Sequence, residues 1–236
     1  MHQPSKHFIY LHGFASSPDS RKARFLVNLF ASRGLKLHCP DLNQPNFSTL
    51  TVTRMIGQVS DLLSGLPSAP TVLIGSSLGA FVVLHIAERS FSETISVHPI
   101  EKMILLSPAL NFGKSGMHDL GYEQYMRWRE SGWLEVMHHT YGELYRVHYE
   151  LYSNASNYDS FATETSIQTL VLQGQHDEVV DPEMVKRFAD TRSHVRLVML
   201  NDDHKLSVSL NRVWSEIEVF LGLDQRQSWF PSLSQS

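Results

Sequence analysis

The pentapeptide Gly75-Ser76-Ser77-Leu78-Gly79 is the part of this sequence with the clearest chemical potential. It follows the apolar run Val72-Leu73-Ile74 and precedes apolar residues spaced like one face of a helix. A serine between two glycines on a sharp strand-to-helix turn is a nucleophile elbow, which exposes the hydroxyl for attack on an acyl carbon. An ordinary glycine-serine turn is the alternative, but the strand before it and the helix after it favour a nucleophile. We therefore predict that Ser77 is that nucleophile, because of the two serines only Ser77 has a glycine two residues before it and another two residues after it.

Two later residues complete the chemistry that a serine nucleophile needs. The acid and the histidine of such a site follow the serine in that order, each on a loop after a later strand. Asp177 lies just beyond the apolar stretch 170–174, and His204 follows the last predicted strand and is expected to open the last helix. We predict that His204 is the general base and that Asp177 orients it and stabilises the imidazolium.

Other acids and histidines have placements that explain them differently. Asp181 precedes Pro182, which is typical of a helix N-cap followed by proline at the first helical position. His194 precedes the last strand, so we expect it at the wrong end of the sheet. Around His138, His139 and His148 no carboxylate or cysteine stands at the spacing of a metal site. We therefore predict no metal there.

Acyl transfer also needs donors for the negative charge that develops on the carbonyl oxygen. In the nucleophile-elbow arrangement one donor is the N–H after the nucleophile and the other comes from a loop after an early strand. These donors are predicted to be the backbone N–H groups of Leu78 and Phe14. Gly13 permits a close backbone approach in that loop, and the His12 side chain is expected to be structural.

Short apolar runs alternate along the chain with longer segments of helical period, which is the pattern of a doubly wound, mainly parallel α/β sheet. The predicted strands cover residues 7–11, 35–39, 71–75, 102–106, 169–173 and 195–200. The predicted helices cover residues 20–33, 51–63, 78–89, 182–191 and 206–221. Ligands bind beyond the carboxyl ends of the strands in such sheets, where the candidate residues lie.

Residues 111–165 interrupt this alternation, because a connection of that length is far longer than usual. We predict one domain over residues 1–236 with a helical cap inserted at about 111–165. Seven of the eight tyrosines lie there, and the spacing of Tyr141, Tyr145, Tyr149 and Tyr152 predicts one helical face. That face is expected to pack on the body of the domain, with direct substrate contact as the alternative.

Composition excludes several classes of function. The 236 residues are 42% hydrophobic and 19% charged, which is typical of a globular domain, and the net charge of −4 does not favour nucleic acid as a partner. No apolar run approaches the roughly 20 residues that span a bilayer, and the start lacks the pattern of a signal peptide. We expect a cytoplasmic protein; the sequence does not indicate its oligomeric state.

The stretch Tyr10-Leu11-His12-Gly13-Phe14-Ala15-Ser16-Ser17-Pro18, continuing to Ser20, Lys22 and Ala23, resembles the opening motif of the YqiA-like small bacterial esterases. These belong to the α/β-hydrolase superfamily, whose pattern the elbow and Asp203-His204 also match. Asn201-Asp202 stands where many relatives carry a glycine before the Asp-His pair. The resemblance implies hydrolysis of small-molecule carboxylic esters or acyl thioesters without a metal or organic cofactor.

Two alternatives to ester hydrolysis stay open at this point. The same serine, histidine and aspartate could cleave a carbon–carbon bond in a diketone or transfer an acyl group to an acceptor other than water. A protein of another class, a binding module without turnover, could also retain the serine. The apolar, aromatic composition of the predicted cap favours a small or medium hydrophobic substrate.

Overall fold

The computed structural model describes residues 6–92, 98–114 and 120–223. Its main sheet has six strands, every neighbouring pair of which is parallel, in the order β2-β1-β3-β4-β7-β8. The strands are β1 (His7–Leu11), β2 (Leu37–His38), β3 (Thr71–Ser76), β4 (Ile100–Leu106), β7 (Gln168–Gly174) and β8 (Val195–Leu200). The predicted doubly wound parallel sheet is therefore confirmed, although β2 is shorter than the predicted strand over residues 35–39.

The direction in which successive strands are added reverses between β1 and β3. The chain passes from β1 outward to β2, and later returns to place β3 on the other side of β1. Connections above such a switch point diverge and leave a crevice at the carboxyl ends of the strands. Residue Leu11 of β1 pairs with Gly75 of β3, so the two segments that follow these residues emerge side by side into that crevice.

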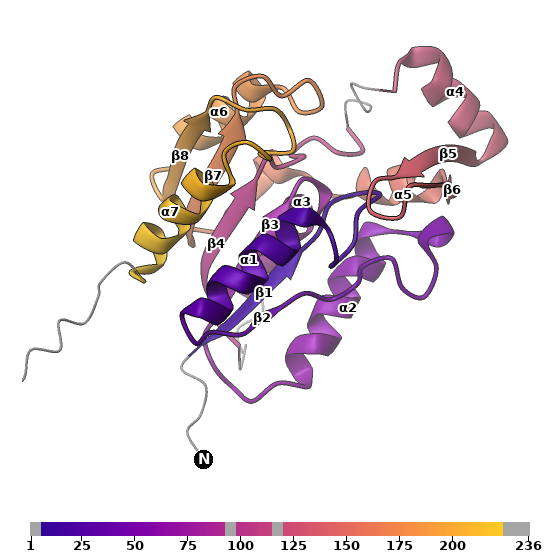
Figure 1. Cartoon of the computed structure of the whole chain (residues 1–236). Helices are drawn as coiled ribbons and strands as arrows, with labels where there is room; N and C mark the ends of the chain where they lie inside the picture. The colour runs from indigo at the N-terminus through magenta and orange to yellow at the C-terminus, as the bar shows by residue number, and fades with distance from the viewer. Residues whose placement is uncertain (1–5, 93–97, 115–119, 224–236) are drawn as a thin grey trace, which may run out of the picture.

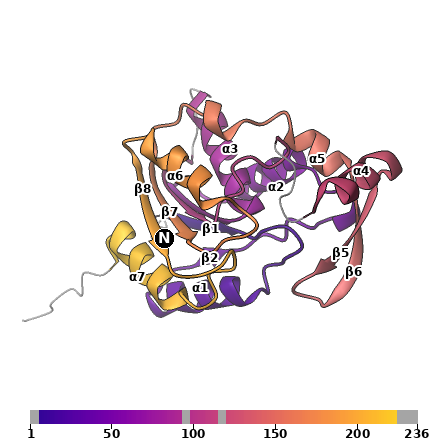
Figure 2. The same ribbon diagram turned by 90° about the horizontal axis from the view of Figure 1, so that it is seen from above.

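Helices cover both faces of the sheet, as the two views in Figures 1 and 2 show. On one face α1 (Arg21–Ser32) and α7 (Leu210–Leu221) share an apolar core with the strands. On the other face lie α2 (Val52–Ser64), α3 (Leu78–Ser92) and α6 (Pro182–Asp190). All the side chains of β1 and β3 are buried, which is expected for central parallel strands covered on two sides.

The predicted helix boundaries are accurate except at the last helix. Asp181 caps α6 by accepting a hydrogen bond from the Glu183 N–H at 3.0 Å, and Pro182 is the first helical residue, as predicted. Helix α7 begins at Leu210, so the prediction that His204 opens this helix is wrong. The intervening loop is held instead by Asp202, whose Oδ2 accepts hydrogen bonds from the N–H groups of Val208 and Ser209.

The segment predicted as a helical insertion, residues 111–165, contains strands as well as helices in the part that the structure describes. Its elements are α4 (Tyr122–Ser131), β5 (Trp133–His138), β6 (Glu143–His148), α5 (Glu150–Ala155) and the 3₁₀ helix η2 (Ser160–Ala162). Strands β5 and β6 form an antiparallel hairpin that lies beside the parallel sheet (Figure 1). The hairpin packs near η1 (Phe47–Thr49), a 3₁₀ helix before α2.

The prediction that the four spaced tyrosines share one helical face is wrong. Tyr141 lies in the turn of the hairpin, Tyr145 in β6, and only Tyr149 and Tyr152 lie at α5. Alternate residues of a strand point to opposite sides, so a helical spacing has no meaning across β6. Tyr149 and Tyr152 still stack, with ring centroids 5.7 Å apart, and Tyr125 of α4 packs on both.

Among the helices in the described ranges, none is long and apolar enough to cross a membrane.

Candidate active site

Ser77 occupies a strained turn between β3 and α3. Its φ of 54° lies in the left-handed region that side chains other than glycine rarely adopt. A Cβ atom at Gly75 would lie 2.5 Å from the Ala80 Cα, and one at Gly79 would overlap the carbonyl oxygen of Leu11. Both glycines are therefore required by the close approach of α3 to β1 and β3, as expected for a nucleophile elbow.

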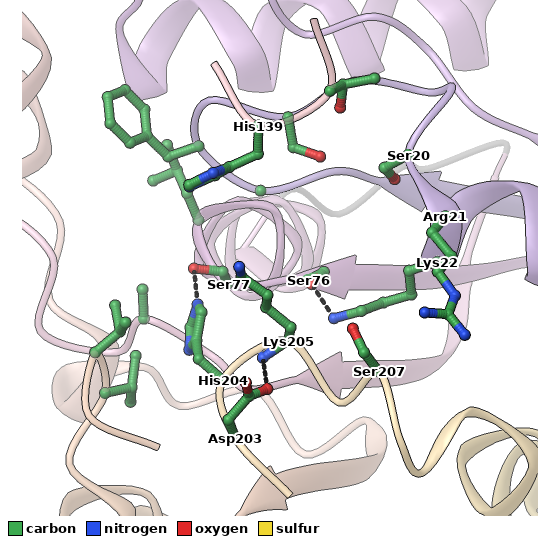
Figure 3. Close-up of a pocket in the computed structure, with 18 of the residues that line it drawn as sticks. Ser20, Arg21, Lys22, Ser76, Ser77, His139, Asp203, His204, Lys205 and Ser207 are labelled. Atoms are coloured by element: carbon green, nitrogen blue, oxygen red, sulfur yellow. Dashed lines mark hydrogen bonds between the residues drawn. The ribbon is translucent and has the colours of Figure 1, made fainter. Parts of the chain in front are cut away.

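The three residues predicted as serine, base and acid lie within hydrogen-bond distance of one another. The His204 Nε2 atom lies 3.0 Å from the Ser77 Oγ, and its Nδ1 atom lies 2.8 Å from the Asp177 Oδ2 (Figure 3 shows the first contact). The carboxylate can only accept, so Nδ1 carries a proton and Nε2 is left to accept the proton of the serine hydroxyl. The Asp177 side chain is 0% exposed, while that of His204 is 19% exposed.

The carboxylate of Asp177 is satisfied by donors on all sides. Its Oδ2 also accepts from Gln173 Nε2 at 2.8 Å, and its Oδ1 accepts from the N–H groups of Val179 and Val180 at 2.9 and 2.8 Å. Burial alone would raise the pKa of Asp177, but the hydrogen bond and charge of His204, together with these donors, outweigh it and lower the pKa. The acid therefore stays ionised at neutral pH and keeps the imidazole in one tautomer.

The loop that carries His204 is held by the residues just before it. Asp202 Oδ1 accepts from the Asp203 N–H at 2.8 Å, in addition to its two bonds across the loop. Gly174, at the end of β7, lets this loop approach, because a Cβ atom there would lie 2.6 Å from the Asp202 carbonyl oxygen. Asp202 thus fills, with its carboxylate, the position before Asp-His where a glycine was expected.

Phe14 and Leu78, whose backbone N–H groups are the predicted oxyanion donors, both line the cavity at Ser77. These two N–H groups donate to no acceptor within the described part of the chain. The Phe14 loop is fixed by His12, a buried side chain whose Nδ1 bonds the Gly13 carbonyl at 2.9 Å and whose Nε2 accepts from the Leu42 N–H at 3.0 Å. A Cβ atom at Gly13 would lie 3.2 Å from the Ser77 Cβ, so this loop lies directly against the elbow.

The other candidates occupy different places. Ser76 is largely buried beside Ser77, and its hydroxyl accepts a hydrogen bond from Lys22 Nζ at 2.9 Å. His194 lies at the start of β8, where its carbonyl accepts from the Thr169 N–H, at the edge of the sheet away from Ser77. His138 pairs with Glu143 and His148 with Trp133 at opposite ends of the hairpin, so these histidines do not gather. No group of three possible metal ligands occurs among the residues that the structure describes.

A cavity of about 1090 Å³ opens over Ser77. One wall is apolar and comes from the loops after β1, β4 and β7 and from α6, with Phe14, Ala109, Phe112, Val179, Val180 and Met184. The opposite wall is polar and comes from the start of α1 and the His204 loop. The hairpin turn of the insertion contributes His139 and Thr140, so the insertion borders the cavity.

Sequence reasoning did not find three residues that support this arrangement. Gln173 donates to Asp177 four residues later, and Asp202 accepts hydrogen bonds within its own loop; the sequence marked Asp202 only as a departure from the usual glycine and did not mark Gln173. Lys22 has a signal, because it is one of three cations at the predicted start of a helix, where cations are unfavourable.

The parallel sheet, its switch point and the strand-to-helix turn at Ser77 define the α/β-hydrolase fold, and solved structures agree with that class. Mouse alpha/beta hydrolase domain-containing protein 10 superposes with a TM-score of 0.76 at 18% identity, covering 94% of this chain and 92% of the other. Est1E from Butyrivibrio proteoclasticus with bound ferulic acid superposes with a TM-score of 0.73 at 17% identity, covering 93% of this chain and 91% of the other. The monoacylglycerol lipase of Paleococcus ferrophilus superposes with a TM-score of 0.72 at 15% identity, covering 93% of this chain and 96% of the other.

The chain belongs to the uncharacterised protein family UPF0227, whose model matches residues 7–221. The predicted resemblance to the YqiA-like branch of the α/β hydrolases is thereby confirmed. No curated protein sequence matches this chain.

Proposed function

We propose that this protein is a serine hydrolase that cleaves carboxylic esters or acyl thioesters through an acyl-enzyme intermediate. The observation that supports this most directly is the continuous hydrogen-bonded chain from Ser77 Oγ through His204 to Asp177 at the base of the cavity. A monoacylglycerol lipase among the proteins of similar fold is consistent with this chemistry.

In this mechanism His204 Nε2 takes the hydroxyl proton of Ser77 as Oγ attacks the acyl carbon. The resulting oxyanion is held by the N–H groups of Phe14 and Leu78, which have no other acceptor in the described part of the chain. The imidazolium then gives its proton to the departing alcohol or thiol, and the acyl group stays on Ser77. Water attacks the acyl-enzyme with His204 again as base, which releases the acid and restores the hydroxyl.

The insertion at residues 111–165 is proposed to act as a cap over the substrate. Its hairpin turn lines the cavity together with the apolar wall, and Phe112 at its start belongs to that wall. An apolar wall of this size suits the acyl or alcohol chain of a small or medium ester.

The test is labelling with a fluorophosphonate probe, which reacts with an activated serine. The wild-type protein is expected to be labelled, and Ser77→Ala and His204→Gln are expected to lose labelling and to lose turnover of p-nitrophenyl butyrate by several powers of ten. Ser76→Ala is the matched serine control and is expected to be labelled. Absence of labelling in wild type would favour a binding module, and unchanged turnover in either triad variant would remove that residue from the mechanism.

A further inference from the structure

The cavity over Ser77 has a wall with positive charge that ester hydrolysis by itself does not need. Arg21, Lys22 and Arg24 at the start of α1 and Lys205 after His204 all line it (Figure 3 labels three of them). None of the four forms an ion pair with another described residue. The first turn of α1 contains no acidic residue, although the positive end of a helix dipole disfavours cations there.

Lys22 contacts the elbow directly through Ser76. Its half-buried side chain reaches Ser76, the residue before Ser77, and Nζ donates to the Ser76 hydroxyl at 2.9 Å. Burial lowers the pKa of Lys22 to about 8, although the charges of Asp177, Asp202 and Asp203 raise it, so the amine is mainly protonated at neutral pH. A partly desolvated ammonium whose hydrogen-bond partner is a neutral hydroxyl gains from an anion placed beside it.

The carboxylates near Lys22 have other partners. Asp177 is bonded to His204, and Asp202 accepts from three backbone N–H groups of its own loop. Asp19, Glu178 and Asp203 also line the cavity; Asp203 accepts from the Lys205 N–H at 2.8 Å, and Glu178 lies on the loop after β7. These carboxylates act on Lys22 through their charge, but among the described residues none forms a direct ion pair with any of the four cations, so each cation can still pair with an anion that enters the cavity.

We propose that the substrate carries an oxyanion group, a carboxylate or a phosphate-type group, which binds Lys22 while the apolar part of the substrate lies against the opposite wall. Arg21, Arg24 and Lys205 surround this group and attract it. Since Lys22 contacts the residue next to Ser77, the anion lies only a few bonds from the scissile carbonyl. This inference rests on the proposed ester hydrolysis at Ser77 and specifies its substrate class.

The test uses esters that differ only in their terminal group. p-Nitrophenyl valerate, mono-p-nitrophenyl glutarate and p-nitrophenyl 4-phosphonobutanoate place a methyl, a carboxylate and a phosphonate after the same three methylenes. The pair 4-butyryloxybenzoate and its methyl ester places the anion on the alcohol side instead. For each set kcat/KM is measured after subtraction of the rate without enzyme. The kcat/KM of the anionic ester is divided by that of the neutral ester, and this ratio is compared between wild type and the variants.

Wild type is expected to prefer the anionic member of at least one set by about tenfold or more, the size of one charge-assisted hydrogen bond. Lys22→Met is expected to remove most of this preference, and Lys22→Arg to retain it. Lys36→Met, at an exposed lysine before β2 and at the opposite end of the sheet, is the control and should keep the wild-type ratio. Because the ratio is measured within one variant, general damage to the elbow cancels. Equal rates for both members of every set, or a preference that survives in Lys22→Met, would overturn the proposal.

A binding measurement separates this inference from the proposed function. Calorimetry on Ser77→Ala compares 4-butyryloxybenzoate and mono-p-nitrophenyl glutarate with their neutral partners, with and without Lys22→Met. Tighter binding of an anionic ester that depends on Lys22 supports the anion site even if turnover or probe labelling fails. Probe labelling and hydrolysis of neutral esters without any anionic advantage would leave the hydrolase standing and remove the anion site.

Discussion

Replacing the Asp177 carboxylate by an amide tests the proposed catalytic chain most directly. Each carboxylate oxygen accepts two hydrogen bonds, Oδ2 from His204 and Gln173 and Oδ1 from the N–H groups of Val179 and Val180. All four partners are donors. In Asp177→Asn the amide NH₂ must therefore face two donors whichever way it is turned.

The two orientations differ in their free-energy cost. With the NH₂ toward Val179 and Val180, two backbone N–H groups lose their acceptor, which costs about 1–3 kcal/mol each. With the NH₂ toward His204, the imidazole can shift its proton to Nε2, and Gln173 can turn its Oε1, which is buried and has no hydrogen-bond partner among the described residues, toward the amide. The second orientation is cheaper, so we expect the variant to adopt it.

This orientation should abolish the base while leaving the fold intact. With the proton on Nε2, His204 faces Ser77 as a donor and cannot accept the hydroxyl proton. The same substitution in another serine hydrolase lowers kcat about 10⁴-fold, which corresponds to about 5.5 kcal/mol of activation free energy. The free energy of unfolding should fall by only about 1–3 kcal/mol, because one buried polar group loses a well-formed hydrogen bond while the rest of the fold is unchanged.

The assay is kcat/KM for p-nitrophenyl butyrate, with urea unfolding in parallel. Asp181→Asn is the matched control: Asp181 lies four residues later, caps α6 through the Glu183 N–H, and asparagine caps helices as well as aspartate. We expect its kcat/KM to stay within about twofold of wild type. Its free energy of unfolding should change by about 0.5 kcal/mol or less, as is usual for a surface substitution. Activity of Asp177→Asn within tenfold of wild type, or an equal loss in Asp181→Asn, would refute the assigned role.

Two further predictions concern the fold. Gly79→Ala should destabilise the protein by about 1–3 kcal/mol or prevent folding, because the new Cβ meets the backbone at the end of β1. Gly57→Ala in α2 should stabilise it by about 0.5–1 kcal/mol, because a Cβ there meets nothing within 4 Å. The urea midpoints of the two variants test both expectations. The lowered pKa of Asp177 stabilises the folded protein fully above the ordinary aspartate pKa of about 3.9, and this contribution is lost as the pH falls through the folded-state value. The contribution of the Asp177 carboxylate to the difference in unfolding free energy between wild type and Asp177→Asn should therefore shrink as the pH falls below about 3.9, and a difference that grows there would contradict the assigned ionisation.

Local physical chemistry made much of the fold predictable. Apolar runs of five or six residues followed by helical periodicity marked each strand and helix of the parallel sheet, because these elements bury their side chains with fixed periods. The elbow was predictable for the same reason: only glycine tolerates the contacts at positions 75 and 79, so their spacing around Ser77 carries the geometry. Proline after Asp181 likewise marked the start of α6.

The hairpin in the insertion was not predictable in this way. The tyrosines at 141, 145, 149 and 152 have helical spacing, but the cross-strand pairing of β5 with β6 determines the conformation of the first two. Pairing is a contact between segments, and its free energy does not appear in the spacing of one segment. The start of α7 was misplaced for a related reason, since the Asp202 side chain holds the preceding loop through contacts six and seven residues away.

By itself the sequence determined which residues could be nucleophile, base and acid, since chain order and the ends of predicted strands restrict these roles. Only the tertiary structure decided that Ser77 and His204, 127 residues apart, lie 3.0 Å from each other, because the strand order brings the ends of β3 and β8 to one edge of the sheet. The same packing places Lys22 against Ser76, 54 residues away, and His204 against Asp177, 27 residues away. Such long-range contacts depend on how the elements pack together, which no local pattern encodes.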